Sequence, residues 1–234
     1  MVNYTKTIVC LANSRRSSGR CIAGKEMLRS GYGGWIRPVS ARQSAELSEE
    51  ERRYEDGRDP RVLDIVVVPM IAHAPLLHHT ENHIIDANYY WTKTKVLPWT
   101  KLGHLLDNPE TLWPSGDSTY YGSNDRVKLE VASKLKVSLL LIKPEDLVLS
   151  VQAEGAEFGN PRRRVRAQFE YRGTSYNLVV TDPVAERAFL SKANGDYRIA
   201  DTYLCVSLSE AHSDGYCYKL VAAVISKQSL RGQR

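Results

Sequence analysis

The stretch LVLSVQAEGAEFGNPRRRVRAQFEYRGTSYNLVVTDPVAERAFLS, residues 147–191, decides the fold. Its first run, 147–154, is apolar and β-branched, which is typical of a strand. Residues 162–172 alternate between polar and apolar and predict a second strand. Gly173 then predicts a tight hairpin into a third strand at 174–182. Three consecutive antiparallel strands are therefore expected here.

A helix is predicted directly after these strands, over 183–191. Asp182 is placed to cap its N-terminus, and Pro183 suits the first helical position because its missing N–H has no partner there anyway. Two further strands, 202–210 and 216–225, form a hairpin across a Gly/Ser/Asp loop. The resulting order, β-β-β-α-β-β, is that of an OB-fold, a small five-stranded barrel. Element order alone does not separate this fold from an SH3-like or other small β-barrel, which stays open as an alternative.

The first half of the chain predicts the same order less cleanly. Residues 20–28 read as a second strand or a short helix, and three glycines within 31–34 predict a turn. Ser48 and Glu51 form a capping box, which predicts that a helix starts there. The remaining elements are strands at 5–12, 34–40 and 61–72 and the helix at 44–54.

Residues 74–126 show little periodicity and hold Trp91, Trp99 and Trp113. We interpret this region as a long aromatic-rich insertion with one short helix at 99–106. The predicted fold class is therefore mainly β with minor α: two tandem OB-like small β-barrels, the first elaborated by the insertion at about 74–126. The predicted domains are an N-terminal barrel over 1–135 and a C-terminal barrel over 136–234.

Composition and charge narrow the classes of function. The chain has 234 residues and a formal net charge of +5. Residues 1–45 hold eight Lys/Arg and one acid, whereas residues 46–64 hold four Lys/Arg and eight acids. A localised positive surface of this kind concentrates polyanions. The alternative is that these charged side chains are solvated and bind no ligand.

The sequence also indicates where the protein works. No apolar run approaches the roughly 20 residues that span a bilayer, and no secretory signal is recognisable at the N-terminus. The four cysteines show no CxxC spacing, so we expect them to be reduced and mostly buried. We therefore expect a cytoplasmic protein with no membrane partner.

The leading candidate site is the segment RRSSGRCIAGKEMLRSGYGGWIRPVS, residues 15–40. Single-stranded nucleic acids are bound by positive grooves combined with aromatic rings on which bases stack. Trp35 is the expected stacking ring. The expected phosphate contacts are Arg15, Arg20, Lys25 and Arg37. The alternative is that Trp35 belongs to the core and that Arg37 pairs with an acid of residues 46–56.

Two further sets of residues suit the same ligand. Strand alternation places three arginines of the second barrel on one face, which could follow phosphates or pair with acids; these are Arg162, Arg164 and Arg166. Asn82 and Asn124 carry amide groups that can read base edges, and Arg126 lies beside the second of them.

Catalytic and metal motifs are weak. His79 and His83 are four residues apart, as helical metal ligands can be, but their stretch has no helical capping and no HExxH order. Neither a Walker A motif nor a dinucleotide fingerprint is present. We predict no catalytic residue, no metal and no cofactor.

Several blocks of the sequence resemble a known family. The most specific is TIVCLANSRRSSGRCIAGKE at 7–26, followed by GWIRPVS at 34–40. Further blocks are LDIV (63–66), ENHIID (81–86), GSNDRV (122–127), YLCVSL (203–208) and YKLVAAVI (218–225). Together they resemble prokaryotic dual OB-containing domain proteins over nearly the whole chain. The resemblance implies two OB barrels and a role in nucleic-acid or nucleotide recognition, in defence against mobile elements, with a protein partner in such a defence system. It brings no catalytic residues.

The first hypothesis is therefore a nucleic-acid-binding module for single-stranded DNA or RNA, or for a modified base or end. The second is an enzyme that processes a nucleotide or nucleic acid. The third is a protein-interaction adaptor, because OB barrels also bind peptides.

Overall fold

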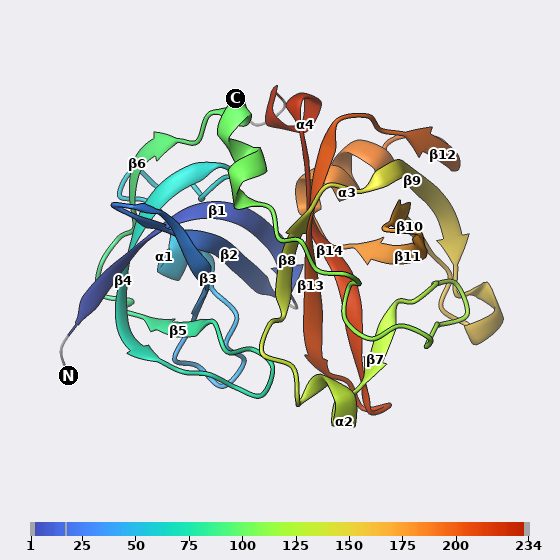
Figure 1. The fold of residues 1–234 in the computed structure, drawn as a ribbon, viewed down its shortest axis with the longest axis horizontal. Coiled ribbons are helices and arrows are strands. Elements are labelled where there is room, and N and C mark those ends of the chain that lie inside the picture. Colours follow the sequence, from blue (N-terminus) through green and yellow to red (C-terminus); the bar gives the residue numbers. More distant parts are fainter. Residues whose placement is uncertain (1–2, 17, 232–234) are drawn as a thin grey trace. The chain divides into compact units, whose positions relative to one another are not determined.

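The computed structural model describes residues 3–16 and 18–231 and shows two compact units (Figure 1). The first unit comprises Met1–Leu106 and Lys136–Ser138, and the second comprises Asp107–Leu135 and Leu139–Arg234. This division differs from the predicted boundary between residues 135 and 136. The segment 107–135 belongs with the second unit because its strand pairs with that unit's sheet.

The first unit is a closed barrel. Its strands are β1 (Tyr4–Arg16), β2 (Gly19–Leu28), β3 (Gly31–Val39), β4 (Asp64–His73), β5 (Asn82–Ile85) and β6 (Thr92–Val96). They pair in the order β1-β2-β3-β5-β4, and β4 pairs back onto β1 and closes the ring. The β3–β5 pair is parallel, and β6 adds to β4 outside the ring. This is the OB plan that the element order predicted.

Alternation along the strands fills this barrel. Ile8 and Cys10 of β1, Ile22 of β2 and Ile36 of β3 point inward and are buried in one apolar cluster. β1 is longer than predicted, and its register with β2 shifts between Cys10 and Ala12, which is a β-bulge. A bulge bends and twists a strand, so one strand can pair with both β2 and β4.

The structure decides two local predictions for the first unit. Residues 20–28 form a strand, so the helix alternative is wrong. The turn predicted at 31–34 is also wrong, because β3 starts at Gly31 and the turn lies at residues 29–30. A Cβ at Gly33 would lie 3.3 Å from the Glu26 Cβ, so the glycine allows close strand packing.

The predicted capping box is present at helix α1 (Glu49–Arg52). The Ser48 hydroxyl accepts from the Glu51 N–H at 3.3 Å, and the Glu51 carboxylate accepts from the Ser48 N–H at 2.8 Å. The helix is one turn long, shorter than predicted, because Arg53 is already extended. Tyr54 follows into the barrel core, where its hydroxyl donates to Asp64 at 2.8 Å.

The aromatic-rich insertion is not confirmed. Strands β5 and β6 lie inside the proposed 74–126 segment and belong to the first sheet. Trp91 is part of the first core cluster. The helix predicted at 99–106 is a 3₁₀ helix, η1 (Trp99–Leu105).

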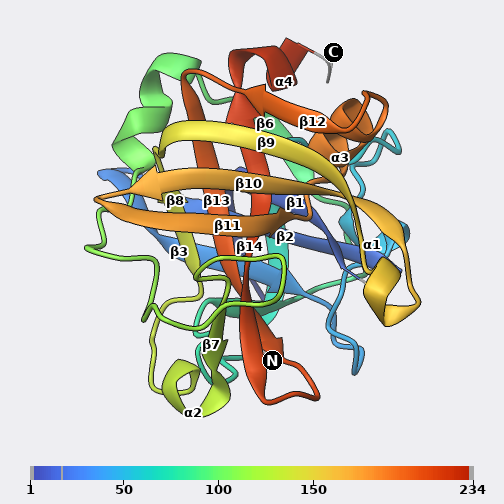
Figure 2. The same cartoon turned by 90° about the vertical axis from the view of Figure 1, so that its right-hand side faces the viewer.

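The second unit repeats the plan with a broken first strand. Its strands are β7 (Arg126–Lys128), β8 (Leu139–Ile142), β9 (Glu145–Glu154), β10 (Arg162–Tyr171), β11 (Thr174–Val180), β12 (Gly195–Arg198), β13 (Thr202–Ala211) and β14 (Tyr216–Ser226). Their order is β12-β9-β10-β11-β14-β13-β8, with β7 on β14. Only Lys143 and Pro144 separate β8 from β9, so the chain closes a barrel through this break. Figure 2 shows β9, β10 and β11 as neighbouring ribbons.

Short helices complete the second unit: α2 (Leu129–Ala132), η2 (Ala156–Phe158), α3 (Pro183–Leu190) and α4 (Lys227–Arg231). Helix α3 starts where predicted. The Asp182 carboxylate accepts from the N–H groups of Val184 and Ala185 and also from the Val224 N–H of β14, so it fixes the helix to the sheet. The predicted β-β-β-α-β-β order is therefore present, with β12 as an additional strand.

The structure bears on two expectations from the sequence, the state of the cysteines and the crossing of a membrane. All four cysteines are free thiols, three of them buried. In the described ranges, no helix is both long and apolar enough to cross a bilayer.

Candidate nucleic-acid interface

The outer face of β2 and β3 brings two predicted site residues together. Because Ile22 and Ile36 point into the barrel, alternation turns Lys25 and Trp35 outward. The two residues are directly opposite in the strand register, and the Lys25 Nζ lies 5.6 Å from the centroid of the Trp35 ring. Trp35 is half-buried. Lys25 is buried, with 8% of the residue exposed, so it supports the indole ring and is not the exposed phosphate contact that the sequence predicted. This is a cation–π pair on the sheet face, so Trp35 is not a barrel-core residue.

The structure does not bring Arg15 and Arg20 onto this face. They are opposite each other near the end of the β1–β2 hairpin. Arg20 is two residues from the inward Ile22 along a regular strand, so both arginines share the side opposite to Lys25. Arg16, paired with Gly19, falls on the Lys25 side.

Arg37 is inaccessible to a ligand. Its side chain is buried, with 2% of the residue exposed. It forms an ion pair with Glu81 at 3.0 Å, donates to the Ser138 hydroxyl at 2.9 Å and donates to the His79 Nδ1. The expected phosphate contact is therefore replaced by a buried ion pair, and the partner is Glu81 rather than an acid of residues 46–56.

Asn82 is equally inaccessible. It lies beside Arg37 in the parallel β3–β5 pair and is buried. Its backbone carbonyl accepts from the Ala74 N–H at 2.9 Å, and its Oδ1 has no hydrogen-bond partner in the described part of the chain. A buried amide cannot read a base edge on the surface, so this expectation is corrected.

The three arginines of β10 share the outward face, as alternation predicted, but differ in access. Arg166 is buried and paired with Glu154 at 2.6 Å, with Asp125 3.8 Å away. Arg164 is half-buried, 3.6 Å from Glu154. Arg162, at the start of the strand, is exposed. The outward face of β10 therefore carries an exposed arginine where the strand begins, whereas the charge of Arg166 further along is neutralised by Glu154.

Asn124 and Arg126 have local structural roles. Asn124 has a positive φ of 51°, its Oδ1 accepts from the Gly116 N–H at 2.7 Å, and its Nδ2 donates to the Ser175 carbonyl at 3.3 Å. An asparagine in this conformation shapes a turn. The Arg126 guanidinium lies 4.1 Å from the centroid of the Tyr216 ring.

The two histidines with metal-ligand spacing, His79 and His83, make contacts within the first unit. The His83 Nδ1 is 2.7 Å from the Tyr4 hydroxyl, and burial lowers the pKa of His83 to about 4. His79 instead accepts from Arg37. Across the described residues, no group of three or more His, Cys, Asp and Glu could hold a metal ion.

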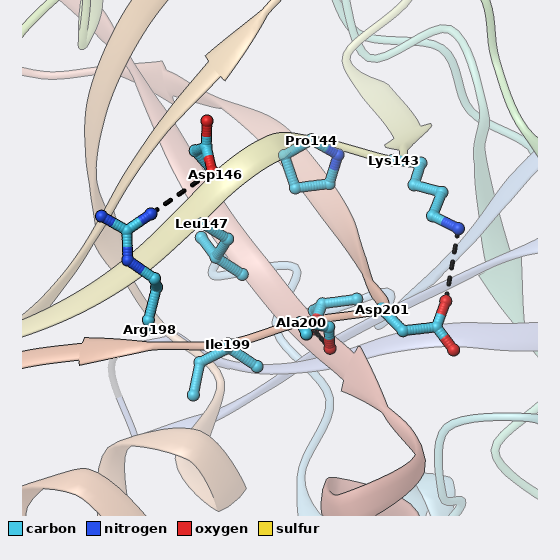
Figure 3. A pocket seen from close by; sticks show the side chains of 9 residues that line it. Lys143, Pro144, Asp146, Leu147, Arg198, Ile199, Ala200 and Asp201 are labelled. Atoms are coloured by element: carbon cyan, nitrogen blue, oxygen red, sulfur yellow. Dashed lines mark hydrogen bonds and ion pairs between the residues drawn. The ribbon is translucent and has the colours of Figure 1, made fainter.

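A shallow cavity of about 240 Å³ lies in the second unit at the β8–β9 break (Figure 3). Its rim carries two ion pairs, Arg198 to Asp146 at 3.3 Å and Lys143 to Asp201 at 3.2 Å. The hydrogen bond from Lys143 lowers the pKa of Asp201. A general base needs a carboxyl pKa that is raised toward neutrality. The lowered pKa of Asp201 is opposite to this requirement, and the charged groups of the rim are paired with each other.

Sequence reasoning missed two exposed aromatic residues of the second unit, Tyr120 and Phe158. Both lie in turns rich in Gly, Ser and Asn, a context in which an aromatic side chain cannot enter a strand's inner face. This turn context is the sequence feature by which the two exposed aromatic residues could have been found.

Both units are closed barrels with the helix between the third and fourth strands, which defines an OB-fold protein with a tandem arrangement. The family model described as the dual OB-containing domain matches residues 6–224. The chain belongs to this family, as the sequence blocks indicated. No curated protein and no solved structure matches it significantly.

Proposed function

We propose that the chain binds single-stranded nucleic acid across the outer face of β2 and β3. The Lys25–Trp35 pair is the observation that supports this proposal most directly. The Lys25 ammonium lies over the half-buried Trp35 indole at the middle of this face. Strands two and three of an OB barrel are the face that receives oligonucleotides. The Trp35 ring supplies a stacking surface, and Arg16 on the same face and the exposed Arg29 at the hairpin turn supply positive charge.

The charge distribution between the units supports this placement. The first unit holds 16 of the 32 lysines and arginines but only 11 of the 27 acidic residues, so its formal charge is +5. The second unit holds 16 of each and is neutral. Several acids of the first unit are also engaged by its own cations, such as Glu26 by Lys6 at 2.9 Å and Glu51 by Arg42 at 2.6 Å. A polyanion is therefore attracted to the first unit.

Membership of the dual OB-containing family supports the same ligand class, because OB barrels commonly bind nucleic-acid strands. The proposal includes the prokaryotic defence role that the family resemblance implies, and the cytoplasmic location expected from the cysteine pattern and from the lack of a recognisable secretory signal. Its site differs from the sequence-based site: Trp35 and Lys25 are kept, Arg16 and Arg29 are added, and the residues left out from the first unit are Arg15, Arg20, Arg37 and Asn82.

The test is fluorescence anisotropy with fluorescein-labelled 20-nucleotide oligothymidine and oligouridine, at salt concentrations from 20 to 300 mM. Trp35→Leu should weaken binding by roughly 5- to 150-fold, the loss of about 1–3 kcal/mol of stacking. Affinity should also fall with salt, because phosphate contacts release counterions. Trp99→Leu, a tryptophan of η1 outside the β2–β3 face, is the matched control.

Two outcomes would contradict the proposal. Either wild-type protein binds no oligonucleotide at 20 mM salt, or Trp35→Leu and Trp99→Leu bind as tightly as wild type. Binding that is insensitive to salt would argue against phosphate contacts on the basic face.

A further inference from the structure

Two aromatic side chains stand out on the surface of the second unit. Tyr120 is 76% exposed and Phe158 is 67% exposed, the largest values among the big apolar side chains of the described residues. Their ring centroids are 5.7 Å apart in an edge-to-face arrangement, and Tyr121 lies 4.9 Å from Tyr120. An apolar cluster that stays in water is typical of a surface with a binding role.

The turn that carries Phe158 is built to hold this ring outward. Gly155 and Gly159 flank the 3₁₀ turn η2, both in the left-handed region with φ of 83° and 70°. The Asn160 N–H donates to the Gly155 carbonyl at 2.9 Å and closes the turn. A Cβ at position 155 would lie 2.5 Å from the Asn160 carbonyl oxygen, so this position needs glycine.

The loop that carries Tyr120 is held equally firmly. The buried Asp125 carboxylate accepts from the Thr119 N–H at 2.7 Å and from the Thr119 hydroxyl. The Thr119 hydroxyl in turn accepts from the Gly122 N–H at 3.0 Å. The Tyr121 hydroxyl accepts from the Gly155 N–H at 3.2 Å and so ties this loop to the Phe158 turn. The two rings are therefore preorganised next to each other.

The same loop covers the outer face of the second barrel. Ser123 and Asn177 of β11 exchange backbone hydrogen bonds, and the Asn177 amide donates to the Tyr121 carbonyl at 2.8 Å. Arg166 is buried in its ion pair with Glu154. These contacts occupy Arg166 and Asn177 in the middle of β10–β11, whereas Arg162 is exposed at the end where β10 begins.

One exposed arginine near the rings in sequence, Arg162, offers a positive charge to an anionic partner. Residues 154–166 contain four arginines and two acids, and one of these acids, Glu154, pairs with Arg166. Arg163 is used within the fold, because its guanidinium donates to the carbonyls of Leu190 and Lys192 at the end of α3. Arg162 is exposed at the first position of β10, and Arg164 is half-buried on the same side.

We propose that Tyr120 and Phe158 form a second stacking site for single-stranded nucleic acid, with phosphates contacting Arg162. The choice of ligand class rests on the proposed function, but the site, its residues and its unit are different. A partner protein is the alternative occupant. The exposed Arg162 favours the nucleic acid, because stacked bases bring a phosphate with every nucleotide.

The experiment compares Tyr120→Ser/Phe158→Ser, Trp35→Leu and the combination of all three in the anisotropy assay with 20-nucleotide oligothymidine. The matched control is Tyr89→Ser/Tyr90→Ser, which removes two exposed tyrosines, 61% and 50% exposed, from the first unit. The second-unit variant should bind at least 10-fold more weakly than wild type, and the control should bind within 2-fold. In addition, Phe158→Trp should report oligothymidine binding by quenching of its fluorescence when Trp35 is replaced by Leu.

The outcomes separate the two proposals. Weaker binding by Trp35→Leu alone, with wild-type affinity for the second-unit variant and no quenching at position 158, would overturn this inference and leave the first site intact. Weaker binding by the second-unit variant alone would support the inference and remove the site from β2–β3. No binding by wild-type protein would overturn both and leave the rings to a partner protein.

Discussion

Lys219 provides a sharp test of how the second unit is stabilised. It lies on β14 with 1% of the residue exposed, and its Nζ donates to the Pro114 carbonyl at 3.0 Å and lies 5.4 Å from the centroid of the Tyr176 ring. Burial lowers the pKa of Lys219 to about 8, and the attraction of Asp125 and Asp117 offsets only part of this effect. The ammonium is therefore held in a site that disfavours its charge.

The sign of the pH dependence follows from this pKa. The folded-state pKa lies below the unfolded value of about 10.4, so the unfolded chain binds more protons between about pH 8 and pH 10.4. This residue's contribution to the unfolding free energy therefore rises with pH through that window. The gap corresponds to a penalty of about 3 kcal/mol at pH 7 that is absent above pH 10.4.

The perturbation is Lys219→Met, which keeps the length of the side chain and removes the charge. At pH 7 the variant should be more stable than wild type by about 1–3 kcal/mol, because the loss of the hydrogen bond to Pro114 offsets part of the gain. At pH 10.4 the two proteins should be nearly equal in stability. The Cys217 thiol, whose pKa burial raises to about 11, destabilises both proteins at high pH and cancels in the difference.

The assay is urea unfolding followed by circular dichroism at several pH values from 7 to 10.4. Lys128→Met is the control, because Lys128 is an exposed lysine of β7 in the same unit. A stability difference between Lys219→Met and wild type that stays constant across this pH range would refute the reasoning.

Two further predictions concern the folds of the two units. Arg37→Ala should destabilise the first unit by about 3–5 kcal/mol in urea unfolding, because it leaves the Glu81 carboxylate buried without its cation; the double variant Arg37→Met/Glu81→Gln should recover most of this loss. If Arg37→Ala kept its stability but lost oligonucleotide affinity, Arg37 would contact ligand after all. Gly155→Ala should destabilise the second unit by about 1–3 kcal/mol in thermal unfolding, because it combines a positive φ with a clash against Asn160. Gly159→Ala has the positive φ without the clash and should cost less; equal costs would contradict the steric argument.

Local patterns were enough for the central elements of the second unit. The Val165, Ala167 and Phe169 alternation, the Gly173 turn and the Asp182–Pro183 helix start each depend on neighbours in sequence. All three are present where they were predicted. The first unit was less clear because its signals conflict: the glycines at 31–34 suggest a turn, but the strands pack closely around them.

The candidate site could be predicted only in part. Alternation placed Arg162, Arg164 and Arg166 on one face, and the same rule puts Lys25 opposite Trp35 once the β2–β3 register is known. The β1 bulge at Cys10/Ala12, which no pattern in the sequence marks, sets which residues of β1 share a face with Lys25. Arg20 and Lys25 are five positions apart on β2, so alternation along that strand puts them on opposite faces, and Arg15 shares the side of Arg20 because the two are paired.

The sequence by itself determined the OB element order, the helix caps, the family and the concentration of positive charge in the first unit. Only the tertiary structure decided which charged groups reach solvent. Arg37 pairs with Glu81, which is 44 positions away, and Arg166 pairs with Glu154, 12 positions away, with Asp125 nearby from 41 positions away. The burial of an arginine depends on whether a distant carboxylate folds against it, because a charge leaves water only when it is paired.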